Sequence, residues 1–189
     1  MKVVLFNSSP RKKGNTSHAL NIVMEELQAE GIECEYIWMG QENLKACKAC
    51  FNCAGKKKCI QDDDKLNEYV GKLIEADGII LGTPTYFADV SSTMKAFIDR
   101  AGMVSKTNGD LYARKVGAAV VAVRRAGATH VFSTLNFFFL IAQMIVVGSS
   151  YWNLGIGLAP GDILKDNEGV QTFKTLGKNL AFALKKLRS

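Results

Sequence analysis

The sequence has little of what marks a membrane or secreted protein. Its most apolar stretch, residues 132–147, is interrupted by polar side chains and falls short of the roughly 20 apolar residues that span a bilayer. The first residues carry only about five apolar side chains before polar ones follow, too few for a secretory signal peptide. We therefore expect a cytoplasmic protein with no membrane segment.

Tracts of positive charge are also missing, although the chain is basic. It has 24 lysines and arginines against 18 aspartates and glutamates, a formal net charge of +6. The basic residues form neither a long run nor a helical stripe interleaved with aromatic side chains, as a nucleic-acid-binding surface requires. We expect no nucleic-acid partner, and the basic balance suits anionic cofactors instead.

Two kinds of active-site motif do not occur. Neither the phosphate loop G-x-x-x-x-G-K-[ST] nor the dinucleotide fingerprint G-x-G-x-x-G is present. The chain has only two histidines, His18 and His130, and neither has an Asp, Ser or Cys partner at a useful spacing. We assign neither histidine a catalytic role.

Short apolar runs alternate with amphipathic segments along the whole chain. This alternation predicts a single α/β domain over residues 1–189, with a parallel sheet covered by helices on both faces. In such folds ligands bind beyond the carboxyl ends of the strands. The predicted strands are 2–7, 33–39, 78–82, 116–123 and a fifth beginning at 144–147, and the predicted helices are 16–29, 62–74, one capped by Ser91 and Ser92, 129–143 and 168–187.

The loop after the first predicted strand, residues 8–17, is typical of a phosphate site. Hydroxyl and amide side chains meet the start of a helix there, with Arg11 beside them. Helical N–H groups and the helix dipole favour an anion, and a guanidinium can bind two of its oxygens. The alternative is an ordinary polar turn in which Asn15 or Thr16 caps the helix.

The loop after the third predicted strand, residues 84–90, contains Tyr86 and Phe87. Aromatic faces and backbone N–H groups are what a flat ring system with polar edges requires. The alternative is that these two side chains only cover the edge of the sheet.

Four of the five cysteines lie in one short segment with the spacing Cys47-x2-Cys50-x2-Cys53-x5-Cys59. Four thiolates from a compact loop can bind a [4Fe–4S] cluster. Zinc, a redox or structural disulfide, or cysteines kept for structure alone remain as alternatives. Cys34, on the second predicted strand, is expected to be a buried core thiol.

These loops, together with the segment Met94–Arg100, resemble the NADPH-dependent FMN reductase-like family, and most of all its iron–sulfur flavoprotein branch. The resemblance implies a flavodoxin-like fold with five strands in the order 2-1-3-4-5, and FMN held by the loops after strands 1, 3 and 4. The cysteine loop, residues 44–61, follows strand 2. The third FMN loop departs from the small, glycine-rich pattern of the branch.

The resemblance also assigns residues to the cofactors. Phosphate would be bound by Ser9, Arg11, Asn15, Thr16 and Ser17; the flavin ring would be lined by Pro84, Thr85, Tyr86 and Phe87; the third loop would supply Arg124, Arg125 and Gly127; the cluster would be held by Cys47, Cys50, Cys53 and Cys59.

The expected function is electron transfer between a [4Fe–4S] cluster, FMN and a partner such as ferredoxin. A cluster-less NAD(P)H-dependent FMN, quinone or azo reductase is the alternative enzyme. A non-enzymatic flavodoxin-like carrier is a further alternative, although flavodoxins are typically acidic. Residues 137–141 are apolar all round a helix, so we also expect a homodimer or homotetramer.

Overall fold

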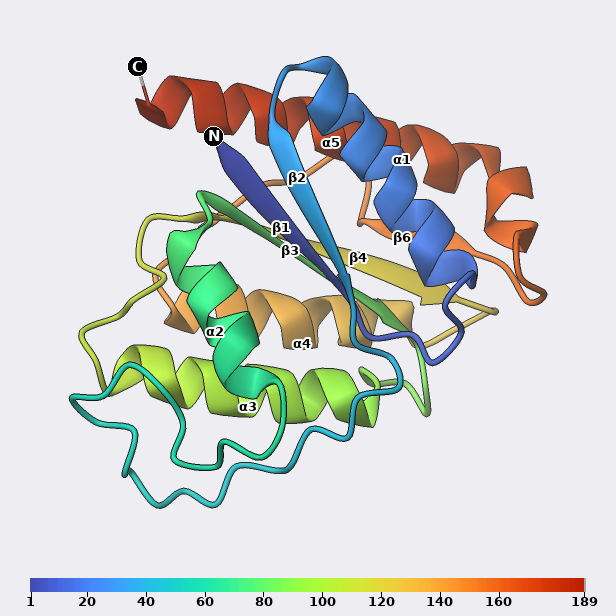
Figure 1. Ribbon diagram of the computed structural model, residues 1–189. Helices are drawn as coiled ribbons and strands as arrows, with labels where there is room; N and C mark the ends of the chain where they lie inside the picture. Colours follow the sequence, from blue (N-terminus) through green and yellow to red (C-terminus); the bar gives the residue numbers. More distant parts are fainter. Residues whose placement is uncertain (189) are drawn as a thin grey trace.

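Strands of the central sheet form from the continuous apolar runs of the sequence. The computed structural model describes residues 1–188 and contains one parallel sheet with the strand order β2-β1-β3-β4-β5, and a sixth strand also pairs with β4 (Figure 1). The predicted flavodoxin-like order is confirmed. The strands are β1 (Lys2–Asn7), β2 (Glu33–Trp38), β3 (Gly78–Pro84), β4 (Val116–Val123), β5 (Ile145–Val146) and β6 (Leu154–Ile156).

Helices cover both faces of the sheet (Figure 1). One face packs against α1 (Asn15–Ala29) and α5 (Asn167–Arg188). The other packs against α2 (Leu66–Glu75), α3 (Ser92–Lys106) and α4 (Ala128–Ile141), and a short 3-10 helix, η1 (Asp162–Lys165), precedes α5.

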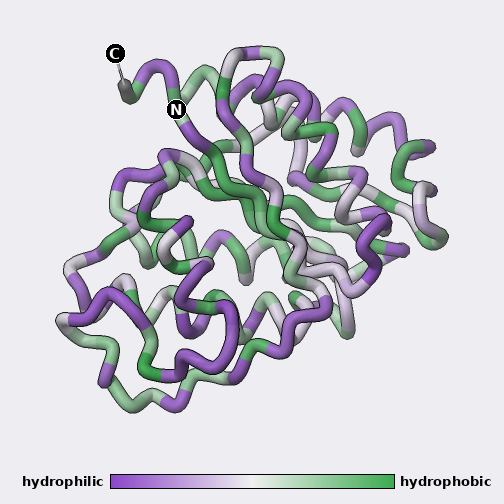
Figure 2. The backbone as a smooth tube through the Cα atoms, viewed as in Figure 1, coloured by the Kyte–Doolittle hydropathy of each residue, from purple (hydrophilic) through white to green (hydrophobic). Residues whose placement is uncertain are grey.

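The strand pleat divides the core between these two layers. Val3 and Leu5 of β1 point to the α1 and α5 side, whereas Val4 and Phe6 point to the α2, α3 and α4 side. All eight residues of β4 are buried, as expected for a central parallel strand. Figure 2 shows these strands as continuous hydrophobic segments, and the loop between β2 and α2 as a mixture of hydrophilic and hydrophobic residues.

The fifth position of the sheet differs from the prediction of one strand. β5 pairs with Val116 and Gly117 at the start of β4, and β6 pairs with residues 121–123 at its end. The chain leaves the sheet between them and is tied back where the N–H of Val121 donates to the carbonyl of Asn153, at 3.0 Å. The sheet position is therefore filled by two short strands.

The predicted start of α2 is wrong. Asp62, Asp63 and Asp64 were expected to supply its cap and first turn, but the N-cap is Lys65 and the helix begins at Leu66. The carboxylate of Asp64 still accepts the N–H of Leu66, at 3.1 Å, but its main partner is a buried arginine described below. In the part of the chain that the structure describes, no helix combines the length and the apolar character needed to cross a bilayer.

Candidate functional site

A hollow lies at the carboxyl edge of the sheet, where β1, β3 and β4 end. Its volume is about 260 Å³, and we call it the carboxyl-edge hollow. Most of the residues predicted to bind the cofactor come together there. Its lining residues are Ser9, Arg11, Asn15, Thr16, Pro84, Thr85, Tyr86, Ala122, Val123, Arg124, Gly157 and Leu158.

The loop after β1 brings an uncapped helix end to this hollow. The N-cap of α1 is Gly14, which has no side chain, and the first turn of α1 contains no acidic residue. The alternative in which Asn15 or Thr16 caps the helix is therefore wrong. Since the N–H groups of a helical first turn and the helix dipole attract anions, this helix end beside Arg11 suits a phosphate.

The same loop is braced against the end of β2. The indole N–H of Trp38 donates to the carbonyl of Ser9, at 2.8 Å, and the ammonium of Lys12 lies over the Trp38 ring. Gly40 is required at this contact, because a Cβ there would lie 1.7 Å from the Ser9 carbonyl oxygen. The phosphate loop is thus fixed before any ligand binds.

The loop after β3 carries a polar group without a partner. The N–H of Thr85 donates to the carbonyl of Ala122, at 2.8 Å, which holds the loop to β4. Its hydroxyl Oγ1 is buried and finds no hydrogen-bond partner among the described residues. Because buried polar groups are almost always hydrogen-bonded, this hydroxyl is expected to bind a ligand in the hollow.

A tight turn follows Thr85. Tyr86 and Asp89 pair through both backbone N–H groups, at 2.9 and 3.0 Å, while Phe87 and Ala88 have positive φ of 48° and 61°. This turn leaves Phe87 fully exposed and outside the lining of the hollow. Residues with side chains adopt positive φ at a cost, so the turn is a strained feature beside the site.

The loop after β4 contributes unevenly. Arg124 lines the hollow, whereas Arg125 and Gly127 line a neighbouring shallow depression with Tyr151 and Trp152. Gly127 has a φ of +88° and would place a Cβ only 3.0 Å from Ala88, so it lets the loops after β3 and β4 touch. Its position is explained by packing.

Ser17, the remaining predicted phosphate ligand, is engaged elsewhere. Its hydroxyl accepts a hydrogen bond from the phenol of Tyr36 at 3.1 Å, and that phenol accepts one from the Asn7 amide at 2.6 Å. This chain ties α1 to β1 and β2. Ser17 does not line the hollow.

A segment that sequence reasoning missed completes the hollow. Gly157 and Leu158 line it after β6, and the side-chain oxygen of Asn15 accepts the N–H groups of Gly161 and Ile163, at 2.9 and 3.4 Å. Asn15 therefore holds this segment against the phosphate loop. The short apolar run 154–156 followed by a turn-rich stretch of glycine and proline was the available signal.

His130 has an aspartate partner that the sequence did not predict. Nε2 of His130 lies 4.0 Å from the carboxylate of Asp89, a partner that is 41 positions away in the sequence, and both side chains are largely exposed. The same carboxylate accepts the hydroxyl of Thr134 at 3.0 Å. Exposed pairs of this kind contribute little energy.

The four loop cysteines line a second, smaller cavity of about 20 Å³, here called the cysteine cavity. All four are free thiols, and Cys53 is buried while Cys50 is exposed. Within residues 1–188 no three metal-ligating side chains are close enough to form a metal site. The residues that line the cysteine cavity are Cys47, Lys48, Cys50, Phe51, Cys53, Cys59, Ile60, Gln61, Arg100, Met103 and Val104.

Side chains from neighbouring helices hold the cysteine loop. The amide of Asn67 brackets Cys59, accepting its N–H at 2.7 Å and donating to its carbonyl at 2.9 Å. The amide of Asn108 donates to the carbonyl of Cys53 at 2.9 Å, and the hydroxyl of Thr107 lies 3.3 Å from the Cys53 sulfur. The backbone around two cysteines is thereby fixed from α2 and from the end of α3.

The strongest of these contacts is a buried ion pair. Arg100 of α3 binds the carboxylate of Asp64, and neither side chain is appreciably exposed. Burial acts to lower the pKa of Arg100, but the Asp64 carboxylate and the Cys59 sulfur beside the guanidinium raise it overall. The guanidinium also donates to the carbonyls of Lys45 and Gln61, at 3.3 and 2.7 Å, and so joins both ends of the cysteine loop to the helix.

Cys34 lies apart from these thiols. It is on β2 and packs against the core of the α1 and α5 side, but it is only partly buried, so the prediction of a buried core thiol holds for its place and not for its degree of burial. Partial burial, with a smaller effect of Glu33, raises the pKa of its thiol to about 11. Such a thiol is protonated and unreactive at neutral pH.

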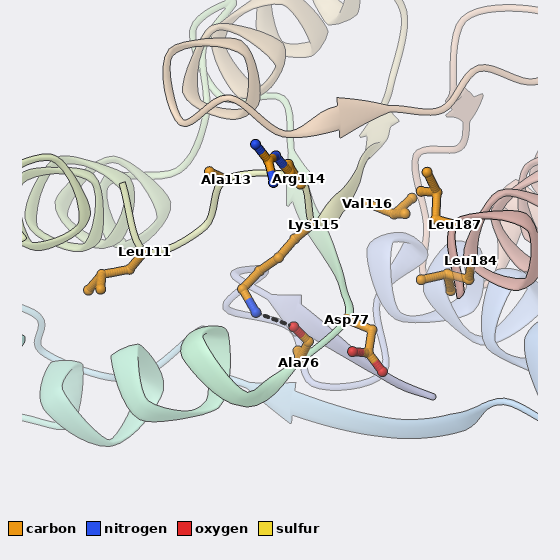
Figure 3. A pocket seen from close by; sticks show the side chains of 9 residues that line it. All are labelled: Ala76, Asp77, Leu111, Ala113, Arg114, Lys115, Val116, Leu184 and Leu187. Carbon is orange, nitrogen blue, oxygen red and sulfur yellow. Dashed lines mark hydrogen bonds between the residues drawn. The ribbon is translucent and has the colours of Figure 1, made fainter. Parts of the chain in front are cut away.

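Another hollow lies at the opposite, amino edge of the sheet (Figure 3). Two of its polar side chains already serve the fold. The ammonium of Lys115 donates to the carbonyls of Ile74 and Ala76 at the end of α2, and burial lowers its pKa. The carboxylate of Asp77 accepts the N–H of Lys2 at 2.9 Å. Because ligands of such sheets bind at the carboxyl edge, this hollow is not a candidate site.

Comparison with known proteins identifies the family of the chain. The family model described as NADPH-dependent FMN reductase matches residues 1–159. The chain belongs to this family. It is 38% identical over 195 residues to an iron-sulfur flavoprotein of Methanocaldococcus jannaschii, with 100% of both chains covered. It is also 32% identical over 186 residues to an iron-sulfur flavoprotein of Methanosarcina thermophila, covering 97% of this chain and 95% of that one.

A solved flavodoxin from the Archaea shares the fold. It has a TM-score of 0.65 and 18% identity, and the match covers 98% of this chain and 99% of that one. Within the NADPH-dependent FMN reductase family, the chain groups with the iron–sulfur flavoproteins. It is a flavin-dependent oxidoreductase, and its flavin is FMN.

Proposed function

We propose that this chain transfers electrons between FMN, a [4Fe–4S] cluster and a ferredoxin-like carrier protein. The observation that supports the cluster most directly is that all four cysteines of the loop line one cavity. When bound, the cluster would supply single-electron steps, and FMN would couple them to two-electron chemistry.

The residues of the carboxyl-edge hollow fit FMN. Arg11 and the uncapped start of α1 would bind the phosphate, with Ser9, Asn15 and Thr16 beside them. The unpartnered hydroxyl of Thr85 would bind a polar atom of the cofactor. Pro84 and Tyr86 would line the ring from the loop after β3, and Arg124 from the loop after β4.

The residues of the cysteine cavity fit a cluster by their chemistry. Cys47, Cys50, Cys53 and Cys59 supply four thiol donors, and Phe51, Met103 and Val104 give the cavity apolar walls. Four thiolates in apolar surroundings are the donor set of a [4Fe–4S] cluster.

Helix α3 begins beside the phosphate loop and continues to the cysteine cavity. The N-cap of α3, Ser91, donates its hydroxyl to the hydroxyl of Ser8 at 2.8 Å, next to the phosphate loop. Two and three turns further along α3, Arg100 and Met103 line the cysteine cavity.

The surface near the cysteine loop suits an acidic electron carrier. Lys56, Lys57 and Lys58 lie at the tip of the loop and are exposed. A cluster of positive charges attracts and orients a negatively charged partner. We further propose that the protein works in the cytoplasm, where cysteines stay reduced.

We propose a homodimer or homotetramer that associates through α4. Phe137, Leu140 and Ile141 are more than half exposed, and Phe137 and Ile141 border an apolar groove shared with α3. Replacing Phe137 with Asp should shift the protein to monomers in sedimentation. A wild-type chain that sediments as a monomer at micromolar concentration contradicts this proposal.

A second candidate is a cluster-less NAD(P)H-dependent FMN, quinone or azo reductase. It is favoured by the shallow depression beside the third loop, where Arg125 lies next to the paired rings of Tyr151 and Trp152, 4.8 Å apart. A cation beside exposed aromatic faces suits a nicotinamide nucleotide.

Anaerobic purification followed by an optical spectrum and by iron and sulfide analysis decides between these functions. The proposed function predicts one FMN and about four irons and four sulfides per chain, in keeping with the four thiolates that a [4Fe–4S] cluster takes. Zinc without sulfide overturns the cluster. A metal-free protein that rapidly oxidises NADPH is the second candidate instead.

A further inference from the structure

Arg100 is a buried cation at the wall of the cysteine cavity. Its side chain has no exposed surface, and the residue lines the cavity with all four loop cysteines. Two of its three nitrogens are engaged. Nη1 binds Asp64 and the carbonyl of Lys45, and Nη2 donates to the carbonyl of Gln61 at 2.7 Å.

The third nitrogen has an N–H to spare. Nε of Arg100 is buried and finds no hydrogen-bond partner among the described residues. Leaving a donor of a charged group unpaired in a protein interior is unfavourable, so such a group indicates a partner that is still to bind. The sulfur of Cys59 lies beside this guanidinium. A thiolate is a far better acceptor than the thiol present without metal.

We infer that Arg100 is a positioning residue for the cluster, whose Nε–H donates a hydrogen bond to the thiolate of Cys59 once the cysteines bind iron. This inference rests on the proposed function. The Asp64 carboxylate already balances the charge of the guanidinium, so the effect on the cluster comes chiefly from the directional hydrogen bond. Hydrogen bonds to cluster sulfurs stabilise the more negative, reduced state and raise the reduction potential.

A purely structural role is the competing explanation. Arg100 also joins Lys45 and Gln61, at the two ends of the cysteine loop, and could serve only as a brace. Asn108 provides a matched control. It braces the same loop through the carbonyl of Cys53, at 2.9 Å, but carries no charge and does not line the cavity.

The first experiment is decided by the wild-type protein, and Arg100→Lys serves as its control. Protein labelled with 15N-arginine is purified anaerobically and its cluster is reduced, and pulsed electron paramagnetic resonance is recorded. A hydrogen bond from Arg100 predicts a 15N hyperfine coupling to the cluster that disappears in Arg100→Lys. A reduced cluster whose signal shows no 15N coupling in the wild-type protein overturns the inference.

The second experiment compares reduction potentials and iron retention. Arg100→Lys keeps the charge but lacks the Nε–H, so the cluster potential should fall below that of the wild-type protein. Asn108→Ala should release iron to a chelator several-fold faster while keeping the wild-type potential. If Arg100→Lys behaves like Asn108→Ala, with faster iron loss and an unchanged potential, Arg100 is only a brace and the inference is wrong.

Different results contradict the proposed function and the role of Arg100. Wild-type protein without iron and sulfide contradicts the proposed function itself. A wild-type cluster without the 15N coupling contradicts only the role of Arg100. Should Arg100→Lys fail to hold a cluster, the spectrum of the labelled wild-type protein still decides.

Discussion

The two candidate sites of this protein are held in place by different means. The loops of the carboxyl-edge hollow start directly at the ends of β1, β3 and β4, so the register of the sheet positions them. The cysteine loop leaves the sheet after β2 and contains no strand or helix. It is held by a few side chains, above all Arg100, Asn67 and Asn108.

This difference separates robust from vulnerable positions. Parallel strand pairs form many backbone hydrogen bonds, and no single side-chain substitution removes them all. Side-chain contacts that hold a loop can each be removed by one substitution. We therefore expect substitutions at the cysteine loop to have larger and more local effects than those at the hollow.

The largest expected effect is the loss of a cluster ligand. Cys59→Ser should lose most of its iron and the broad visible absorbance while keeping FMN, because the flavin loops lie elsewhere in the sequence and in the fold. Ferredoxin-linked reduction of the flavin should slow sharply, whereas reduction by dithionite should persist. Cys34→Ser is the control. Because Cys34 lies outside the cavity, this variant should retain its iron. Parallel loss of iron and FMN in Cys59→Ser would show that the sites depend on each other.

Breaking the buried ion pair comes next. Asp64→Asn leaves Arg100 charged and poorly paired in the interior, which costs about 3–5 kcal/mol of unfolding free energy for pairs of this kind. Urea denaturation measures this change. Asp63→Asn is the control, since that carboxylate pairs with Lys45 at the surface, and its loss should cost much less than the loss of the buried pair. Equal losses in the two variants would contradict the importance of burial.

The same ion pair predicts a dependence on pH. Burial acts to raise the pKa of Asp64, but hydrogen bonds from Arg100 and from the N–H groups of Lys45 and Leu66 lower it overall. A lowered pKa in the folded state contributes stability above the unfolded value of about 3.9, which is lost as the pH falls through the folded value. The stability difference between the wild-type protein and Asp64→Asn should therefore shrink below about pH 4.

A smaller effect is expected at the phosphate loop. Arg11→Ala should weaken FMN binding by about 1.5–3 kcal/mol, roughly 10- to 150-fold in Kd, the scale of a charged hydrogen bond. Fluorescence titration of the apoprotein with FMN measures it. Lys13→Ala removes an exposed charge from the same loop without altering the lining of the hollow, and should change affinity much less. Equal affinities of Arg11→Ala and the wild-type protein would remove Arg11 from the site.

The smallest effect is expected at residues 157–163, the segment that was not predicted from the sequence. Asn15→Ala removes the acceptor of the Gly161 and Ile163 N–H groups and should weaken FMN binding by about 1 kcal/mol. Amide hydrogen exchange over residues 157–163 should become faster, while exchange over β1 and β3 stays unchanged. Unchanged exchange in this segment would show that Asn15 does not hold it.

The strands and loops that could be predicted best from the sequence are those that a local pattern of residues determines. β1, β3 and β4 are continuous apolar runs, and the loops that follow them were assigned to the site because strand ends meet at one edge. β6 was missed because three residues, one of them Gly155, carry too weak a signal. Gly157 and Leu158 were missed with it.

Contacts between residues far apart in the sequence could not be predicted from local pattern. Asp64 was interpreted as a helix-capping residue because aspartate is common there, and only the packing of α3 shows that Arg100 binds it. The contact of Asn15 with Gly161 and Ile163 spans most of the chain. Such contacts depend on where the loops pack, which neither spacing nor composition records.

The divided fifth position of the sheet has a consequence for solubility. The outermost strand of a sheet offers unpaired N–H and C=O groups to other molecules and can nucleate aggregation. Here that border consists of β5, two residues long, and β6, three residues long, separated by an excursion of the chain. No continuous ladder of free backbone groups is left along this border of residues 1–188, so a second molecule has too short a template to extend the sheet on this side.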